Sequence, residues 1–299
     1  MTDRYIVFVP GKNPKPAPEQ HRALLWRALV EGVRRAASGV PDELNRNAEH
    51  FKLIAWNFLY YRQIKDETRD LPWIEALIRK QAPTARDIQE AGSWFVRLDR
   101  LLFSAADAVP ALIPLLPKPL RMTAEETRRY FENKDGIANG IRELAKQTLR
   151  PLLDADAKIL LIGHSLGAVI AYDTLWELSH LEKVSGRIDE FLTLGSPLGM
   201  HYVQRRLMGF RERGRRRYPT NIRKWVNVSA VGDLTALDEA VADDFQEMRT
   251  LGLVESIKDY DKSIYNFFRD EQGLNCHRSY GYLINAFVGK LVADWWRRN

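Results

Sequence analysis

The sequence contains very little cysteine and no long apolar run. Among its 299 residues, Cys276 is the single cysteine, which excludes an internal disulfide framework and a cysteine-based zinc cluster. One thiol is typical of proteins from reducing compartments, so we expect a cytoplasmic location. The longest apolar stretch, 105–116, is interrupted by one aspartate and two prolines. It is too short for a transmembrane helix, which needs about 20 residues.

The sequence also lacks the features of a signal peptide, internal repeats and low-complexity segments. Asp3 and Arg4 precede only five apolar residues, 5–9, before Pro10. The apolar core of a signal peptide spans roughly 7–15 residues. Hydrophobic residues make up 45% of the chain and charged residues 28%, a balance that favours a folded protein over a disordered one.

Short apolar segments alternate with helical patterns along the chain. The expected strands are 5–9, 51–60, 158–162, 191–194 and 225–231. Apolar residues at helical spacing predict helices at 19–37, 137–149, 166–178 and 280–296. Such alternation is typical of an α/β fold with a mostly parallel central sheet and helices on both faces. We expect residues 1–299 to form one such domain.

The segment 65–133 breaks this alternation. It is rich in aromatic residues, leucine and proline. A structureless loop of this length is improbable within a compact domain, so we predict a helical insertion, a lid or cap, over the sheet. Its apolar residues would either line a substrate pocket or form a small core of their own, and the pattern does not separate these two alternatives.

The motif that carries chemistry is Gly163-His164-Ser165-Leu166-Gly167, which fits G-x-S-x-G. It follows an expected strand and begins an expected helix, the context in which this pattern presents a nucleophile. A sharp turn there would place Ser165 beyond the carboxyl end of the strand. Gly163 and Gly167 would occupy positions where a side chain has no room. The N–H of Leu166, at a helix N-terminus, could donate to a developing oxyanion. An ordinary glycine-rich turn with a capping serine is the alternative.

This motif resembles the nucleophile elbow of the α/β-hydrolase superfamily, in particular its lipase- and esterase-like serine hydrolases. Residues 191–197 resemble the next strand and turn of lipase-like members. Residues 225–228, leading to Asp233, are similar to the strand that delivers their catalytic acid. The resemblance covers most of the chain outside 65–133. It implies the α/β-hydrolase fold and a reaction at an ester bond, and says little about the substrate.

A serine hydroxyl is a weak nucleophile and needs an adjacent base. In this fold the acid and then the histidine follow the serine along the chain. Of the six histidines, only His277 lies after Asp233, so His277 is the expected base. An aromatic residue, Tyr280, follows it, as in lipase-like proteins. The alternative is a histidine on a surface loop.

The expected acid is Asp233, which directly follows the strand 225–231. Loops at the carboxyl ends of parallel strands commonly carry function. Asp233 would orient His277 and stabilise its charged form rather than take a proton. Asp238, five residues further along, is the substitute, and a simple turn aspartate is the alternative role for Asp233.

The second oxyanion donor should come from the loop after the first strand. Many relatives carry His-Gly there, whereas this chain carries Pro10-Gly11. The backbone amide of Lys12 or Gly11 can still donate, and Lys12 is the expected donor. The Gly-Lys pair is not a P-loop, because the spacing of that motif is absent. The resemblance implies neither a metal nor an organic cofactor.

The positive charge of the chain is concentrated in one segment. The 45 basic and 39 acidic residues give a net charge of +6, and 205–217, with seven arginines and one glutamate, accounts for all of it. The segment is either a solvated loop or a contact for an anionic surface. The arginines of that contact would be Arg211, Arg213, Arg215, Arg216 and Arg217. We expect it at the sheet edge opposite Ser165, away from substrate, and no nucleic-acid-binding motif accompanies it.

Together these features predict a serine hydrolase that cleaves a carboxylic ester through an acyl-enzyme. The lipase-like resemblance implies a small-molecule or lipid ester as substrate, and the apolar 65–133 segment suits an acyl chain. Two alternatives are a hydrolase-fold protein that binds without turnover, and a membrane- or nucleic-acid-docking protein that uses 205–217. Since Cys276 precedes His277 directly, we also expect its modification to block the site.

Overall fold

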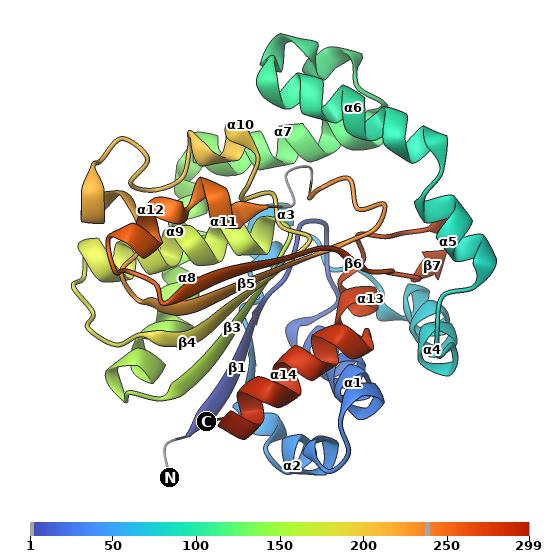
Figure 1. The fold of residues 1–299 in the computed structure, drawn as a ribbon, viewed down its shortest axis with the longest axis horizontal. Helices are drawn as coiled ribbons and strands as arrows, with labels where there is room; N and C mark the ends of the chain where they lie inside the picture. The colour runs from blue at the N-terminus through green and yellow to red at the C-terminus, as the bar shows by residue number, and fades with distance from the viewer. Residues whose placement is uncertain (1–2, 237–239, 299) are drawn as a thin grey trace.

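A six-stranded parallel sheet forms the centre of the molecule (Figure 1), in a computed structural model that describes residues 3–236 and 240–298. The strands are β1 (Arg4–Val9), β2 (Phe51–Leu53), β3 (Lys158–His164), β4 (Ile188–Leu194), β5 (Ile222–Ala230) and β6 (Ser256–Ile264). Their order is β2-β1-β3-β4-β5-β6. The order reverses between β1 and β3, and in such sheets ligands bind outside the carboxyl ends of the strands at the point of reversal.

Helices cover both faces of this sheet, as the alternating pattern predicted (Figure 1). One face carries α1 (Pro18–Ala36), α2 (Val40–Arg46), α13 (Ser279–Leu283) and α14 (Ala286–Arg298). The other carries α8 (Ile137–Asp154) and α9 (Leu166–His180). Along β1, Ile6 and Phe8 join the core beneath α1, while Val7 and Val9 join the core beneath α9. Since successive residues of a strand point to opposite faces, both faces of β1 are buried.

The remaining elements connect the strands or lie at the ends of the sheet. Outside 65–133 they are η1 (Ala48–His50), α3 (Asn57–Tyr61), η4 (Lys134–Gly136), α10 (His201–Gln204), η5 (Gly214–Arg217), α11 (Val241–Asp244), α12 (Gln246–Thr250) and the short hairpin of β7 (Arg269–Asp270) and β8 (Gly273–Leu274). Within the described residues, no helix has the length and apolar character needed to cross a membrane.

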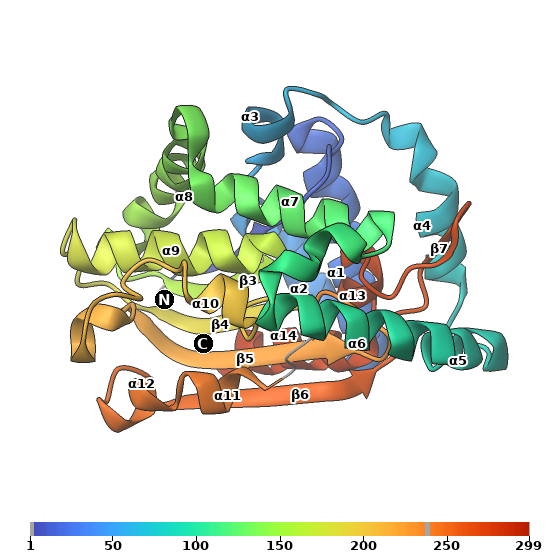
Figure 2. The ribbon, with the colours of Figure 1, turned by 90° about the horizontal axis from the view of Figure 1, so that it is seen from above.

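The segment 65–133 is helical, as expected. It contains η2 (Glu67–Arg69), α4 (Leu71–Arg79), α5 (Ala85–Ala91), α6 (Trp94–Ala108), η3 (Pro110–Leu115) and α7 (Lys118–Glu132). Its helices lie in two places. α4 lies near α1, whereas α6 and α7 cross above the carboxyl ends of the strands (Figure 2). Only the second half of the segment therefore covers the sheet edge.

Two expected elements are wrong in their extent. The strand expected at 51–60 ends at Leu53, because the chain then turns into α3. There Trp56 Nε1 and Asn57 Nδ2 donate to backbone carbonyls of the loop after β1. The closing helix expected at 280–296 is two helices. Ile284 and Asn285 separate them, and the side-chain oxygen of Asn285 accepts from the N–H of Phe287 at 2.9 Å.

Candidate active site

Ser165 lies on a strained turn between β3 and α9. Its φ is 55° and its ψ is −132°, a conformation that L-residues rarely adopt and that recurs at functional sites. A Cβ on Gly163 would lie 2.6 Å from Ala168 Cα, and one on Gly167 would lie 2.2 Å from the carbonyl oxygen of Val9. Backbone atoms cannot yield that space, so the expectation that both glycines are required sterically is confirmed.

His277 lies between Ser165 and Asp233 and contacts both side chains. Its Nε2 is 2.8 Å from Ser165 Oγ, and its Nδ1 is 2.9 Å from Asp233 Oδ2. One neutral tautomer satisfies both contacts, with Nδ1–H donating to the carboxylate and Nε2 accepting from the hydroxyl. Ser165 and Asp233 follow β3 and β5, and His277 follows the β7–β8 hairpin beyond β6. The three residues therefore meet at the carboxyl ends of the parallel strands.

The carboxyl group of Asp233 is buried and fully hydrogen-bonded. Its side chain is 0% exposed. Besides His277, its Oδ2 accepts from the hydroxyl of Tyr282 at 2.6 Å, and its Oδ1 accepts from the N–H of Thr235 at 2.9 Å. Burial alone would raise the pKa of Asp233, but the charge of His277 and these hydrogen bonds outweigh it and lower the pKa below its ordinary value. Asp233 is therefore ionised at neutral pH.

The remaining sequence candidate for the acid, Asp238, falls outside the described residues.

Gly195, at the end of β4, leaves room for the contact between Asp233 and His277. A Cβ on Gly195 would lie 2.5 Å from Asp233 Oδ2 and 3.1 Å from His277 Nδ1. Its φ of +53° also favours glycine.

Two supporting residues escaped the sequence analysis. Tyr282 donates to Asp233 and accepts from the N–H of Ala230 at 2.9 Å, so one hydroxyl fixes the acid against the end of β5. The ring of His164 donates through Nε2 to the carbonyl oxygen of His277 at 2.8 Å. Burial, reinforced by the charge of His277, holds the pKa of His164 well below its ordinary value, so this ring is neutral. The run of aromatic residues after His277 contains Tyr282 as well as Tyr280, and the sequence pattern alone does not distinguish them.

Unpaired backbone amides lie beside Ser165. Gly11 approaches the elbow so closely that a Cβ there would lie 2.8 Å from Ser165 Cβ. Within the residues the structure describes, no acceptor is found for the backbone N–H of Lys12 or of Leu166. Both residues line the same cavity as Ser165. The N–H of Gly11 also lacks an acceptor in that part of the chain, so it stays an alternative donor.

A small apolar cavity lies above Ser165. It encloses about 30 Å³, room for about two water molecules. The covering elements contribute Phe103, Ala106, Asp107, Ile113, Thr123, Ala124 and Thr127. The second half of the 65–133 segment thus lines the cavity over Ser165. Its buried residues also join the core that contains α8 and α9 rather than a separate one.

Polar contacts hold α6, η3 and α7, here called the cover, over the carboxyl ends of the strands. The ammonium group of Lys12 donates to Thr123 Oγ1 at 2.8 Å and pairs with Glu126 at 3.1 Å. The carboxylate of Asp107, in α6, accepts from the backbone N–H groups of His201 and Tyr202 at 2.8 and 2.9 Å. The outer side of α6 is apolar and exposed, and it carries Trp94, Phe95, Leu98, Leu101 and Leu102.

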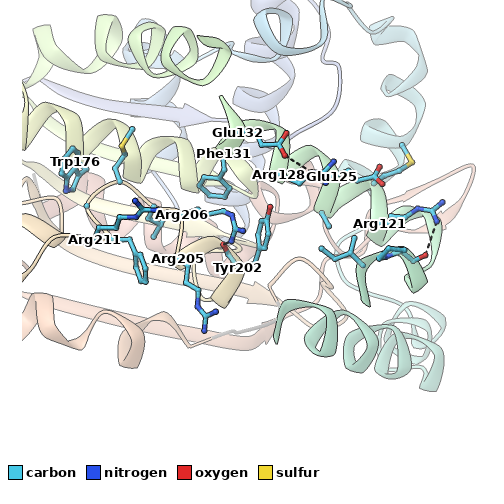
Figure 3. Close-up of a pocket in the computed structure, with 18 of the residues that line it drawn as sticks. Arg121, Glu125, Arg128, Phe131, Glu132, Trp176, Tyr202, Arg205, Arg206 and Arg211 are labelled. Carbon is cyan, nitrogen blue, oxygen red and sulfur yellow. Dashed lines mark hydrogen bonds and ion pairs between the residues drawn. The ribbon is translucent and has the colours of Figure 1, made fainter. Parts of the chain in front are cut away.

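The arginine-rich segment 205–217 divides between two places. Arg205, Arg206 and Arg211 line a groove of about 1160 Å³ between α7 and residues 202–212 (Figure 3). Tyr202, Ile113 and Ala124 line both this groove and the cavity over Ser165. The sequence predicts residues 211–218 at the end of the sheet opposite Ser165. This expectation is wrong for Arg211, because the chain still lies beside α6 and α7 at that residue.

The end of the segment lies where the sequence suggested. The carbonyl of Arg216 accepts from Trp176 Nε1 at 2.9 Å, and Arg215 donates to the carbonyl of Leu251 at 3.1 Å. Trp176 belongs to the last turns of α9, at the opposite end of that helix from Ser165.

Cys276 is buried beside the acid. Burial, with the charge of Asp233, raises the pKa of its thiol to about 12. A Cβ on Gly232 would lie 3.1 Å from its sulfur, so the thiol is closely packed. Among the described residues, no group of three or more His, Cys, Asp or Glu side chains is arranged to hold a metal ion.

Comparisons of the chain with protein-family models, with curated proteins and with solved structures returned no match. The structure itself defines an α/β fold with an all-parallel, six-stranded central sheet and helices on both faces. Any functional assignment therefore depends on the geometry around Ser165.

Proposed function

We propose that this chain is a serine hydrolase of the α/β-hydrolase fold that cleaves a carboxylic ester through an acyl-enzyme. The observation that carries the proposal is a pair of hydrogen bonds that link three side chains. His277 Nδ1 is 2.9 Å from Asp233 Oδ2, and His277 Nε2 is 2.8 Å from Ser165 Oγ. The proposal is also supported by the strained backbone of Ser165 at the strand-to-helix turn. A structural histidine or a helix-capping serine would not require these two hydrogen bonds together with a strained serine backbone.

The first half of the reaction forms the acyl-enzyme. His277 Nε2 takes the proton of Ser165 Oγ as that oxygen attacks the acyl carbonyl carbon. The carbonyl oxygen becomes negative, and the N–H groups of Leu166 and Lys12 stabilise it. His277 then gives the proton to the oxygen of the departing alcohol, and the carbon–oxygen bond of the ester breaks.

The second half uses the same groups on water. His277 takes a proton from water, which attacks the acyl carbon, and returns that proton to Ser165 as the acid product leaves. Asp233 stays ionised, holds the imidazole in the required tautomer and stabilises its positive form. Its lowered pKa supports this role. Neither a metal nor an organic cofactor has a part in these steps.

We propose that α6, η3 and α7 act as a lid. The cavity over Ser165 is too small for an ester with an acyl chain, so these elements must move for substrate to enter. The apolar lining contributed by Phe103, Ala106 and Ile113 supports an acyl chain as the group that replaces them. The substrate class that suits this site is a lipid or other acyl ester.

A panel of p-nitrophenyl esters with increasing acyl length tests this function. We expect wild-type protein to release p-nitrophenol, with kcat/KM rising from the acetyl ester to medium-chain esters. Ser165→Ala should lose at least 10³-fold of this activity while remaining folded. The matched control is Ser179→Ala, a serine of the same helix that is remote from the site. The absence of hydrolysis by folded wild-type protein at every chain length would contradict the proposal.

A further inference from the structure

A second hollow lies beside the cavity over Ser165. It measures about 320 Å³ and is lined by Asp107, Tyr202, Arg205, Arg206 and Arg211. Asp107 and Tyr202 also line the cavity over Ser165. The hollow is therefore the immediate neighbour of the proposed acyl site, and its three arginines continue into the larger groove (Figure 3).

The described residues that line this hollow carry three positive charges and one negative charge, so a positive excess remains. None of the guanidinium groups of Arg205, Arg206 and Arg211 forms an ion pair with a carboxylate of the described residues. Arg206 stacks over the ring of Tyr202 at 3.8 Å and donates to its carbonyl oxygen at 2.9 Å, which leaves its other N–H groups free. The one acidic lining residue, Asp107, already accepts two backbone N–H groups.

Three unpaired guanidinium groups around one hollow repel each other, and an anion would relieve that repulsion. The chemistry of the segment also points to a particular anion. All seven basic residues of 205–217 are arginine and none is lysine. The planar fork of arginine matches the oxygen geometry of phosphate and can bind it through two parallel hydrogen bonds.

We propose that this hollow binds a phosphate group carried by the ester substrate. The acyl chain would then occupy the cavity under the lid while the phosphate contacts Arg205, Arg206 and Arg211. This inference rests on the proposed ester hydrolysis and narrows its substrate to phosphate-bearing acyl esters. The phosphate belongs either to a soluble ester or to the headgroup of a lipid in a membrane, and both share the same chemistry at the site.

The test compares two esters that differ only in the phosphate, hexanoylglycerol phosphate and hexanoylglycerol, both kept monomeric. Their binding to Ser165→Ala is measured by calorimetry, so that turnover is not needed. We expect the phosphate ester to bind at least about tenfold more tightly, with a preference that weakens as salt is added. In the Arg205→Ala/Arg211→Ala background this preference should fall towards one. Arg213→Ala/Arg215→Ala, which removes the same charge outside the hollow, should retain it.

Other outcomes overturn the inference. Equal binding of the two esters, or equal loss of the preference in both arginine double variants, contradicts a phosphate site in this hollow. A second arm uses long-chain forms of the same esters in phosphatidylcholine vesicles. A preference confined to vesicles also contradicts the site, because surface charge would then explain it, whereas a preference in both arms supports a lipid headgroup as a source.

Hydrolysis by the wild-type protein separates this inference from the proposed function. If the phosphate preference is found but neither ester is hydrolysed, the phosphate site stands and ester hydrolysis fails. If both esters are hydrolysed with equal kcat/KM and bind equally, ester hydrolysis stands and the phosphate site fails.

Discussion

Two helices of 15 residues, α9 and α6, have similar shares of apolar residues but opposite surroundings. In α9 every residue from 166 to 178 is buried, whereas Phe103 and Ala106 are the buried residues of α6. Helix α9 lies against the sheet and directly follows Ser165. Helix α6 lines the cavity with Phe103 and Ala106 and exposes its large side chains Trp94, Phe95, Leu98, Leu101 and Leu102. It lies above the carboxyl ends of the strands (Figure 2). Apolar content alone therefore does not say which helix fixes a site and which one covers it.

The residues around Ser165 and the residues of the cover are held in place in different ways. At the carboxyl ends of the strands, the packing leaves no space for a methyl group on Gly163, Gly167 or Gly195. The cover is instead held by a few polar contacts, mainly those of Lys12 and Asp107. Substitutions at the carboxyl ends of the strands should change catalysis and stability, whereas substitutions in the cover should change the access of substrate to Ser165.

The largest contrast is expected in catalysis. Asp233→Asn should lower kcat/KM for a p-nitrophenyl ester by about 10³–10⁴-fold, because an amide cannot hold His277 in the required tautomer. Asp107→Asn, the same change in the cover, should alter it by less than about tenfold. Steady-state kinetics of both variants measure the contrast, and equal losses would remove the distinction between the two regions.

The next contrast is in stability. Leu175→Ala, in α9, removes a fully buried side chain and should lower the free energy of unfolding by about 2–5 kcal/mol. Leu101→Ala, in α6, changes a side chain that is 68% exposed and should stay within about 0.5 kcal/mol of wild type. Urea unfolding followed by circular dichroism measures both. A large loss for Leu101→Ala would show that its exposed face is needed for folding.

A smaller effect is expected on the opening of the cover. Asp107→Asn keeps one acceptor oxygen and loses the charge that binds the backbone N–H groups of His201 and Tyr202. Amide hydrogen exchange in α6 should become about tenfold faster, with exchange in β3 and β4 unchanged. Uniform acceleration across the chain would instead indicate global destabilisation.

The last prediction concerns the thiol of Cys276, which is buried beside Asp233. With a pKa of about 12, its thiol is almost entirely protonated at pH 8, and its rate of alkylation by iodoacetamide should be about 10³-fold below that of a free thiol. The rate should rise with pH as the thiolate forms. Activity measured after slow alkylation then tests whether a group on this sulfur blocks the adjacent His277. Rapid labelling of the native protein at pH 8 would contradict the buried placement.

Much of the sheet could be predicted because its central strands are continuous apolar runs. The expected segments 5–9, 158–162, 191–194 and 225–231 all lie within strands of the structure. Strand β6 was not predicted, since its apolar residues, Ile257, Tyr260 and Ile264, are spaced three and four apart rather than at the two-residue period of a strand. It pairs only with β5 at the edge of the sheet, where polar side chains can reach solvent. The apolar run 51–60 does not distinguish strand from helix by itself.

The candidate site was predictable to the extent that it depends on chain order. Ser165, Asp233 and His277 were selected from motif, order and count, and the structure brings their side chains together. The roles of Tyr282 and His164 depend on how α13 and the loop before it pack, which no local pattern encodes. The placement of the first arginines of 205–217 likewise depends on α10 and the cover, elements joined by tertiary contacts rather than by sequence proximity.

Reaction with a fluorophosphonate probe, followed by mass spectrometry, tests the central claim most directly. The probe reacts with a serine only when an adjacent base activates it, so its target reports the state of Ser165. We predict stoichiometric labelling of the wild-type protein on Ser165, strongly reduced labelling of Asp233→Asn, and none of Ser165→Ala. Folded wild-type protein that remains unlabelled, or that is labelled on another residue, would contradict the account.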